Sequence, residues 1–212
     1  MQNSLHALQS AFSLLHSFRW LNQLEALWQL GSRRLSGRWH LFCEAPPMAK
    51  ELETAYFRKL RMIYCSELQM IGFLADLAEQ TADFKFGSSM QGVLRLCGER
   101  IEALEKIAVD REFWPEGDDG EVMERLVTEG RHELRHCARG RSRDVVIADI
   151  CISLHRFLVV NYRLARNLAN RLEWADDASR LEELMDLLEE RFPQTCDHSV
   201  RRSAFAPAAL AV

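Results

Sequence analysis

The sequence predicts an all-α bundle of helices, and three observations support this fold class. Apolar residues recur at steps of three and four along successive stretches, which is the period of one face of a helix. Segments with Gly, Pro, Ser and Asp separate these stretches and predict short loops. No stretch shows the alternation of apolar and polar residues that is typical of a strand. With 212 residues, 48% of them hydrophobic, the chain suits one domain with appendages.

The first half of the bundle is predicted to be two long helices. Proline is tolerated in the first turn of a helix, so Pro47 is compatible with a helix over about 49–80. A loop through Gly87 follows, and Ser88 or Ser89 can cap the next helix. A turn-rich segment at 114–120 ends that helix. Its apolar face is formed by Met90, Val93, Leu94, Cys97, Ile101, Leu104 and Ala108.

The second half is predicted to be one short helix and two longer ones. The short helix spans about 121–138 and stops near Gly140. Asp144 then begins a helix to about Leu172 whose first turns are apolar on nearly all sides, which indicates a central helix. A last helix is expected to end at about Arg191, because Pro193 cannot continue its hydrogen bonds.

One glutamate interrupts the apolar face of the first long helix. Glu67 shares that face because it stands at the same steps of three and four as its apolar neighbours. It therefore points into whatever the helix packs against. An isolated buried charge is very costly, so this carboxylate must be paired, metal-bound or protonated. The full stripe is Leu52, Tyr56, Leu60, Ile63, Glu67, Ile71, Leu74 and Ala78.

The ends of the chain are predicted to be appendages. Residues 1–47 form an N-terminal amphipathic extension, 48–193 the bundle, and 194–212 a flexible tail rich in Ala and Pro. Three interpretations of the extension stay open: an extra helix on the bundle or on a partner chain, a transit peptide or membrane-surface helix, and an overextended reading frame that never orders. Its amphipathic pattern consists of Leu5, Leu8, Phe12, Leu15, Trp20, Leu24 and Leu27.

Composition argues against several classes of partner. The net charge of -4 gives no reason to expect nucleic acid or acidic lipid. No run approaches the roughly twenty apolar residues of a membrane span, and no signal-peptide pattern opens the chain. Six cysteines without a Cys-x-x-Cys pair indicate free thiols in a reducing compartment. We therefore expect a cytoplasmic protein without a nucleic-acid partner and without stable membrane insertion.

Several motifs resemble one family of helical bundles. The segment Arg61-Met-Ile-Tyr64-Cys-Ser-Glu67 resembles the first helix of the YciE/YciF group of bacterial ferritin-like proteins. The segment Met123-Glu-Arg-Leu-Val-Thr-Glu-Gly130 is similar to that group's short-helix pattern, and Glu189-Glu190 matches the pair on its final helix. The resemblance covers about 56–193. It implies a ferritin-like up-down bundle, with the N-terminal amphipathic helix as an addition.

The resemblance also implies a metal centre, from which this chain departs. In ferritin-like di-metal proteins, carboxylates and histidines from four helices converge on two ions. Glu67 and Glu189 are kept here. On the second helix, the group's His-x-x-Glu corresponds to Val93 and Leu96, which cannot bind a metal. On the long helix, its Glu-His-Tyr-Glu corresponds to 155–158, which reads His-Arg-Phe-Leu. A di-iron site is therefore not expected.

Two interpretations of the remaining polar residues follow. In the favoured one, no cofactor is bound, and Glu67 forms a buried polar network with His155 or with Tyr162, which the resemblance marks as retained. In the alternative, Glu67, His155 and Glu189 form an altered site for iron or manganese, since these ions prefer oxygen and imidazole ligands.

A separate string, His132-Glu133-Leu134-Arg135-His136, formally matches the zincin motif of two histidines one helical turn apart with a general-base glutamate. A catalytic zinc ion needs three protein ligands, and no third ligand follows at a suitable spacing. An all-α bundle also lacks the fold in which zincins hold this motif. We expect an exposed Glu133 and no peptidase activity, while metal binding by the two histidines stays open.

Together these observations predict a non-catalytic ferritin-like bundle with a degraded di-metal centre. It is expected to act through assembly as a homo-oligomer, such as a dimer, or through a protein partner, and the resemblance suggests a stress response. The alternative is a metal-handling or redox protein built on the altered site at Glu67, His155 and Glu189.

Overall fold

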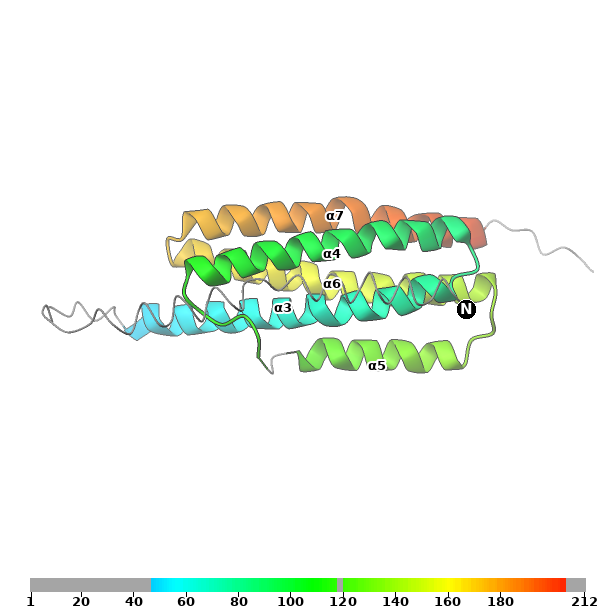
Figure 1. The fold of residues 1–212 in the computed structure, drawn as a ribbon, viewed down its shortest axis with the longest axis horizontal. Coiled ribbons are helices and arrows are strands. Elements are labelled where there is room, and N and C mark those ends of the chain that lie inside the picture. The colour runs from blue at the N-terminus through cyan, green and yellow to red at the C-terminus, as the bar shows by residue number, and fades with distance from the viewer. Residues whose placement is uncertain (1–46, 118–119, 205–212) are drawn as a thin grey trace, which may run out of the picture. The chain divides into compact units, whose positions relative to one another are not determined.

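The computed structural model describes residues 47–117 and 120–204, which form an all-α structure (Figure 1). The predicted extra N-terminal helix lies outside the described residues. Among the described residues there are five helices and no strand. They are α3 (Pro47–Gln80), α4 (Phe84–Asp110), α5 (Glu121–Arg135), α6 (Arg141–Arg171) and α7 (Ala175–Ala204).

Four of these helices form the bundle, and the fifth lies against its outside. Helix α3 contacts α4 and α6, and α7 contacts the same two helices, so the four close a ring around one core. Helix α5 contacts only α3 and α6 among the described helices, and Figure 1 shows it alongside α3 on the outer side. The predicted helical bundle with short loops is confirmed, and α6, like α3, contacts three other described helices.

The core follows a seven-residue repeat on both α3 and α4. On α3 the buried residues that follow this repeat include Glu67, whereas the predicted Ile71 and Ala78 are only partly buried. A strict repeat of seven shifts the buried face slightly relative to an ideal helix, so Met70 and Leu77 take those places. The buried residues that follow the repeat are Tyr56, Leu60, Ile63, Glu67, Met70, Leu74 and Leu77 on α3, and Phe86, Met90, Val93, Cys97, Arg100, Leu104 and Ile107 on α4.

Aspartates define the turn between α3 and α4, which differs from the prediction. Helix α4 begins at Phe84 rather than at a serine, because Asp83 caps it by accepting from the backbone N–H groups of Lys85 and Phe86. Asp144 was predicted to begin α6, but it lies buried within the first turn. Its carboxylate accepts from the backbone nitrogens of Ala82 at 2.8 Å and Asp83 at 3.0 Å, so it holds the turn onto the bundle.

Two further expectations about helices need correction. Helix α7 continues past Pro193 to Ala204, so the predicted stop at Arg191 is wrong. Proline removes one backbone hydrogen bond, and the turns on either side can keep theirs. Helix α6 is long and apolar enough by composition alone to cross a membrane, although the sequence had suggested no such run. A helix covered on three sides by its own bundle has the same composition.

Helix α5 is docked at one glycine. An added Cβ at Gly130 would lie 3.0 Å from Cγ2 of Ile150 on α6 and 3.1 Å from Cζ of Phe73 on α3. A Cβ at this position would press on both neighbouring side chains, so glycine lets the short helix lie close to α3 and α6. This close approach gives a packing reason for the glycine that ends the motif at 123–130.

Candidate functional site: a charged network in the bundle core

The buried face of α3 meets α4 at an ion pair that is sealed from solvent. The guanidinium of Arg100 donates from Nε to Oε1 of Glu67 at 2.7 Å and from Nη2 to Oε2 at 2.9 Å. Both side chains are 0% exposed. A bidentate guanidinium–carboxylate pair is the strongest common form of charged hydrogen bonding in proteins, because two parallel bonds fix its geometry.

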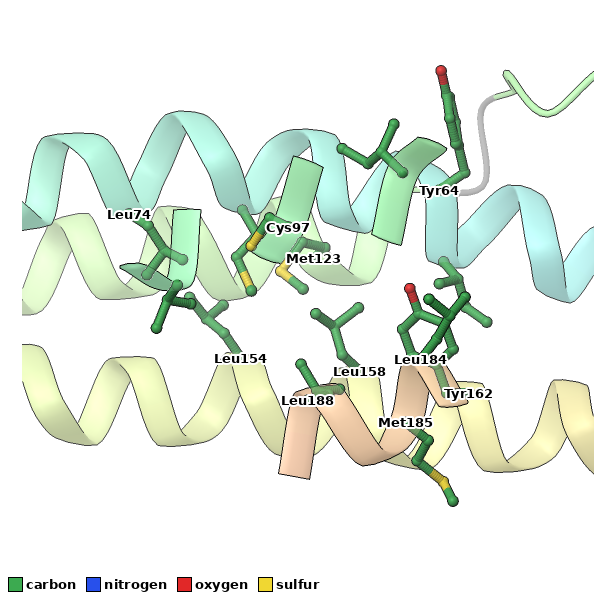
Figure 2. Close-up of a cluster of buried hydrophobic side chains, with 14 of the residues drawn as sticks. Tyr64, Leu74, Cys97, Met123, Leu154, Leu158, Tyr162, Leu184, Met185 and Leu188 are labelled. Carbon is green, nitrogen blue, oxygen red and sulfur yellow. The ribbon is translucent and has the colours of Figure 1, made fainter. Parts of the chain in front are cut away.

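Two neighbours complete this central network, which we define as Glu67, Cys97, Arg100 and Tyr162. The Tyr162 hydroxyl, from α6, donates to Oε1 of Glu67 at 3.0 Å. The Cys97 sulfur, one turn before Arg100 on α4, accepts from Nη2 at 3.1 Å. Figure 2 shows both Cys97 and Tyr162 among the apolar side chains of the core, including Leu154 and Leu158. Three helices thus meet at one buried carboxylate.

The network keeps its charges fixed. Burial opposes the charge on Arg100, but the Glu67 carboxylate outweighs it and holds the pKa of the guanidinium above its usual value. Burial raises the pKa of the Cys97 thiol to about 12, and the nearby carboxylate adds to the effect. The same two causes raise the pKa of Tyr162 well above its ordinary value. At neutral pH the thiol and the phenol therefore remain protonated, and Cys97 is a poor nucleophile.

One atom of the network has no partner among the described residues. Nη1 of Arg100 is buried and makes no hydrogen bond there. An unsatisfied buried donor is uncommon and costs about 1–3 kcal/mol. The two bonds to Glu67 therefore offset the free-energy cost of leaving Nη1 without an acceptor.

A second buried carboxylate lies at the end of the bundle where α7 begins. Oδ2 of Asp177 accepts from the Tyr56 hydroxyl and from Nε of Arg111, both at 2.9 Å. The guanidinium carbon of Arg111 lies 4.0 Å from the centre of the Trp174 ring, a cation–π contact. We call Tyr56, Arg111 and Asp177 the end network. It joins α3, the end of α4 and the first turn of α7.

The predicted site residues are only partly brought together. Tyr162 does bond to Glu67, as the favoured interpretation expected. His155 instead has Nε2 at 3.1 Å from the backbone oxygen of Leu188, which requires the proton on Nε2 because a carbonyl can only accept. Glu189 pairs with Arg163 at 3.1 Å, and both side chains are about half exposed. The three candidate ligands therefore lie in different surroundings.

The positions opposite Glu67 on α4 also differ from the sequence comparison. Arg100 bonds to Glu67, and Cys97 bonds to Arg100. Val93 and Leu96 take no part in these bonds. Cys97 and Arg100 have the same separation of three, one helical turn later. The sequence comparison had considered only Val93 and Leu96 on this helix, so it did not find the pair one turn later.

These residues do not fit the di-metal centre that the fold family implies. The guanidinium of Arg100 already engages both oxygens of Glu67 and carries a permanent positive charge. A second cation beside it would meet that charge at close range. Within residues 48–117 and 120–189, whose side chains the structure describes, no group of three His, Cys, Asp or Glu side chains could hold a metal ion.

The zincin-like string lies on the outside of α5. His132, Glu133 and His136 are all exposed, as expected for Glu133. The string has no third protein ligand, since the described residues hold no group of three suitable side chains. The geometry needed for a catalytic zinc ion is therefore not met here.

Sequence reasoning missed Arg100 although a signal was present. Arg100 stands three residues after Cys97 and four before Leu104, so it occupies the buried stripe of α4. Arginine at such a position indicates a buried carboxylate on a facing helix, because a buried charge must be paired. Glu67 was the only such carboxylate recognised. Arg111 and Asp177 had no comparable pattern, because they lie at helix ends.

Comparisons with known proteins agree with this architecture. Residues 51–192 match a family described as a domain of unknown function, DUF892. The crystal structure of the E. coli stress protein YciF is similar with a TM-score of 0.67 and 18% identity, covering 73% of this chain and 98% of that one. YcfI, a putative structural protein from Rhodopseudomonas palustris, has a TM-score of 0.66 and 17% identity, covering 73% and 97%. A search among curated proteins finds no match. The ferritin-like fold and the YciF resemblance are confirmed.

Proposed function

The chain belongs to the DUF892 family, and we propose that it is a non-catalytic, stress-related bundle that acts in the cytoplasm through assembly or protein binding. In this proposal the central network replaces the di-metal centre, so the bundle needs no cofactor. One similar structure is that of an E. coli stress protein and another that of a putative structural protein, and both descriptions support such a role.

The observation that carries the proposal is the engagement of Glu67 by Arg100. The two bonds of 2.7 and 2.9 Å use both carboxylate oxygens, and Tyr162 adds a third bond. Because arginine stays charged at any physiological pH, it neutralises the carboxylate without metal. Polar side chains that bond to one another in a sealed core support a structural role better than a catalytic one. The raised pKa of Cys97, about 12, also argues against nucleophilic chemistry there.

The first test is the metal content of the purified full-length chain. Iron and manganese should be far below one ion per chain, and treatment with a chelator should leave the melting temperature unchanged. One iron or manganese ion per chain, with a melting temperature that falls on chelation and recovers with that ion, would overturn the proposal. It would favour instead the altered site at Glu67, His155 and Glu189.

The second test concerns assembly and stress. Sedimentation of the full-length chain should give the mass of a dimer or larger complex, or a stable complex with one partner protein. Deletion of the gene should lower survival under at least one stress, and the chain with Arg100→Met and Glu67→Met together should restore survival if it folds. A monomer at all concentrations, together with unchanged survival, would contradict the proposed role.

A further inference from the structure

The end of α5 carries two histidines that the central network does not use. His132 and His136 are exposed, and their ring centres lie 4.8 Å apart in an edge-on arrangement. Residues four apart on a helix project from the same face, one turn above the other. The two imidazoles therefore face the same patch of solvent.

The electrostatic setting of this pair suits a cation. His132 lies in the last turn of α5, and His136 caps its C-terminus. The C-terminal end of a helix bears partial negative charge and favours positive ligands. Glu129 and Glu133 are exposed on either side of His132 in sequence and add negative charge, while Arg135 opposes it. Arg139, three residues after His136, is also exposed and opposes a cation, whereas Arg131 pairs with Asp76 at 3.2 Å.

We propose that His132 and His136 together chelate one zinc, nickel or copper(II) ion on the surface of α5. Imidazole nitrogens suit these ions, whereas manganese prefers oxygen ligands. Water would fill the other coordination positions, because no third protein ligand is present among the described side chains. The site is therefore a surface chelate, without the three-ligand arrangement of a zinc peptidase. This proposal does not depend on the proposed function.

The test is a calorimetric titration of the reduced, metal-free, full-length chain with Ni²⁺. Wild type should show one saturable site that both His132→Asn and His136→Asn weaken by at least about tenfold, since each removes the advantage of two linked ligands. Addition of Ni²⁺ should also raise the melting temperature of wild type more than that of either variant. The variants are compared with wild type because the chain has seven histidines, and the others can also bind Ni²⁺ weakly.

A matched control separates the pair from the number of histidines. The double variant His132→Asn/Arg135→His keeps seven histidines but places two of them next to each other, where they do not share a face. Its Ni²⁺ affinity should stay as low as that of His132→Asn. Glu124→Gln, on an exposed position two turns before His132, should keep the wild-type affinity within about threefold, since both imidazoles and their neighbouring charges remain. Circular dichroism checks that each variant is folded. Wild-type affinity in His132→Asn and His136→Asn, or in the double variant, would overturn the proposal.

Discussion

The central network and the end network combine similar polar side chains in different surroundings. Each joins one carboxylate to one arginine and one tyrosine. On α4 the two arginines are eleven residues apart, about three turns or roughly 16 Å along the helix. Arg100 is sealed with 0% exposure, whereas Arg111 is 27% exposed and covers Trp174. Both networks therefore use the same kinds of hydrogen bond, but only the arginine of the end network is accessible to water.

This difference indicates what each network contributes. When Asp177 is lost, Arg111 at the end of the bundle can be solvated, so the loss of one partner costs less stability there. A charge in the centre has no such alternative, so each member depends on the other. The central network is therefore a stronger constraint on which sequences can fill this core. Four predictions follow from this comparison, beginning with the largest effect.

Glu67→Ala should destabilise the protein by about 3–5 kcal/mol, because it leaves the Arg100 guanidinium buried without a counter-charge. Urea unfolding at pH 7 measures this loss. Replacing both Glu67 and Arg100 with methionine should cost less than Glu67→Ala alone, since two apolar side chains of similar volume leave no orphaned charge. A loss below about 1 kcal/mol for the single variant would mean that water reaches Arg100.

Asp177→Ala should have a smaller effect, about 1–3 kcal/mol, because Arg111 can turn to solvent while the Tyr56 hydroxyl loses its acceptor. The same urea experiment compares it directly with Glu67→Ala. Adding 0.5 M NaCl should reduce the cost of Asp177→Ala more than that of Glu67→Ala, since salt screens exposed charges more than buried ones. Equal costs in both variants would show that exposure of the arginine is unimportant.

His155 should make the protein less stable in mild acid. Burial lowers the pKa of this imidazole below its ordinary value; the bond to Leu188 opposes this, and the charge of Arg100 adds to it. In the unfolded chain the imidazole takes up a proton near pH 6.5, above the pH at which the folded one does. The contribution of the neutral His155 to the free energy of unfolding is therefore complete above about pH 6.5. It is lost as the pH falls through the lowered pKa of the folded protein.

Free energies of unfolding from urea titrations at pH 7.5, 6.5 and 5.5 would measure this dependence. His155→Gln should reduce the slope between pH 6.5 and 5.5, because glutamine does not titrate. An unchanged slope would assign the acid sensitivity to other groups.

Glu133→Ala should change stability by no more than about 0.5 kcal/mol, because its side chain is exposed on α5. Thermal unfolding followed by circular dichroism measures this. The variant serves as the surface reference for the other three. A zinc-dependent peptidase activity that disappears with Glu133→Ala would contradict the structural assignment of this string.

Sequence periodicity was sufficient to predict the helices and to predict that the side chain of Glu67 points into the core. Both depend on local geometry, because residues three and four apart share a helix face whatever lies opposite. The requirement that this carboxylate be satisfied also followed from the residue alone. Element boundaries were less certain. Asp144 holds the turn between α3 and α4 from the first turn of α6, and this contact is not local. The cap by Asp83 is local, but nearby serines offered an equally good cap in the sequence.

Only the tertiary structure decided which partner satisfies Glu67. Arg100, Tyr162 and His155 all stand near the buried faces of their helices, but periodicity does not determine the relative height of two helices within one turn. A shift of one turn exchanges Val93 and Leu96 for Cys97 and Arg100 opposite the carboxylate. The sequence by itself determined that a charge lies in the core, and packing determined that a guanidinium neutralises it, because packing alone sets the distance between helices.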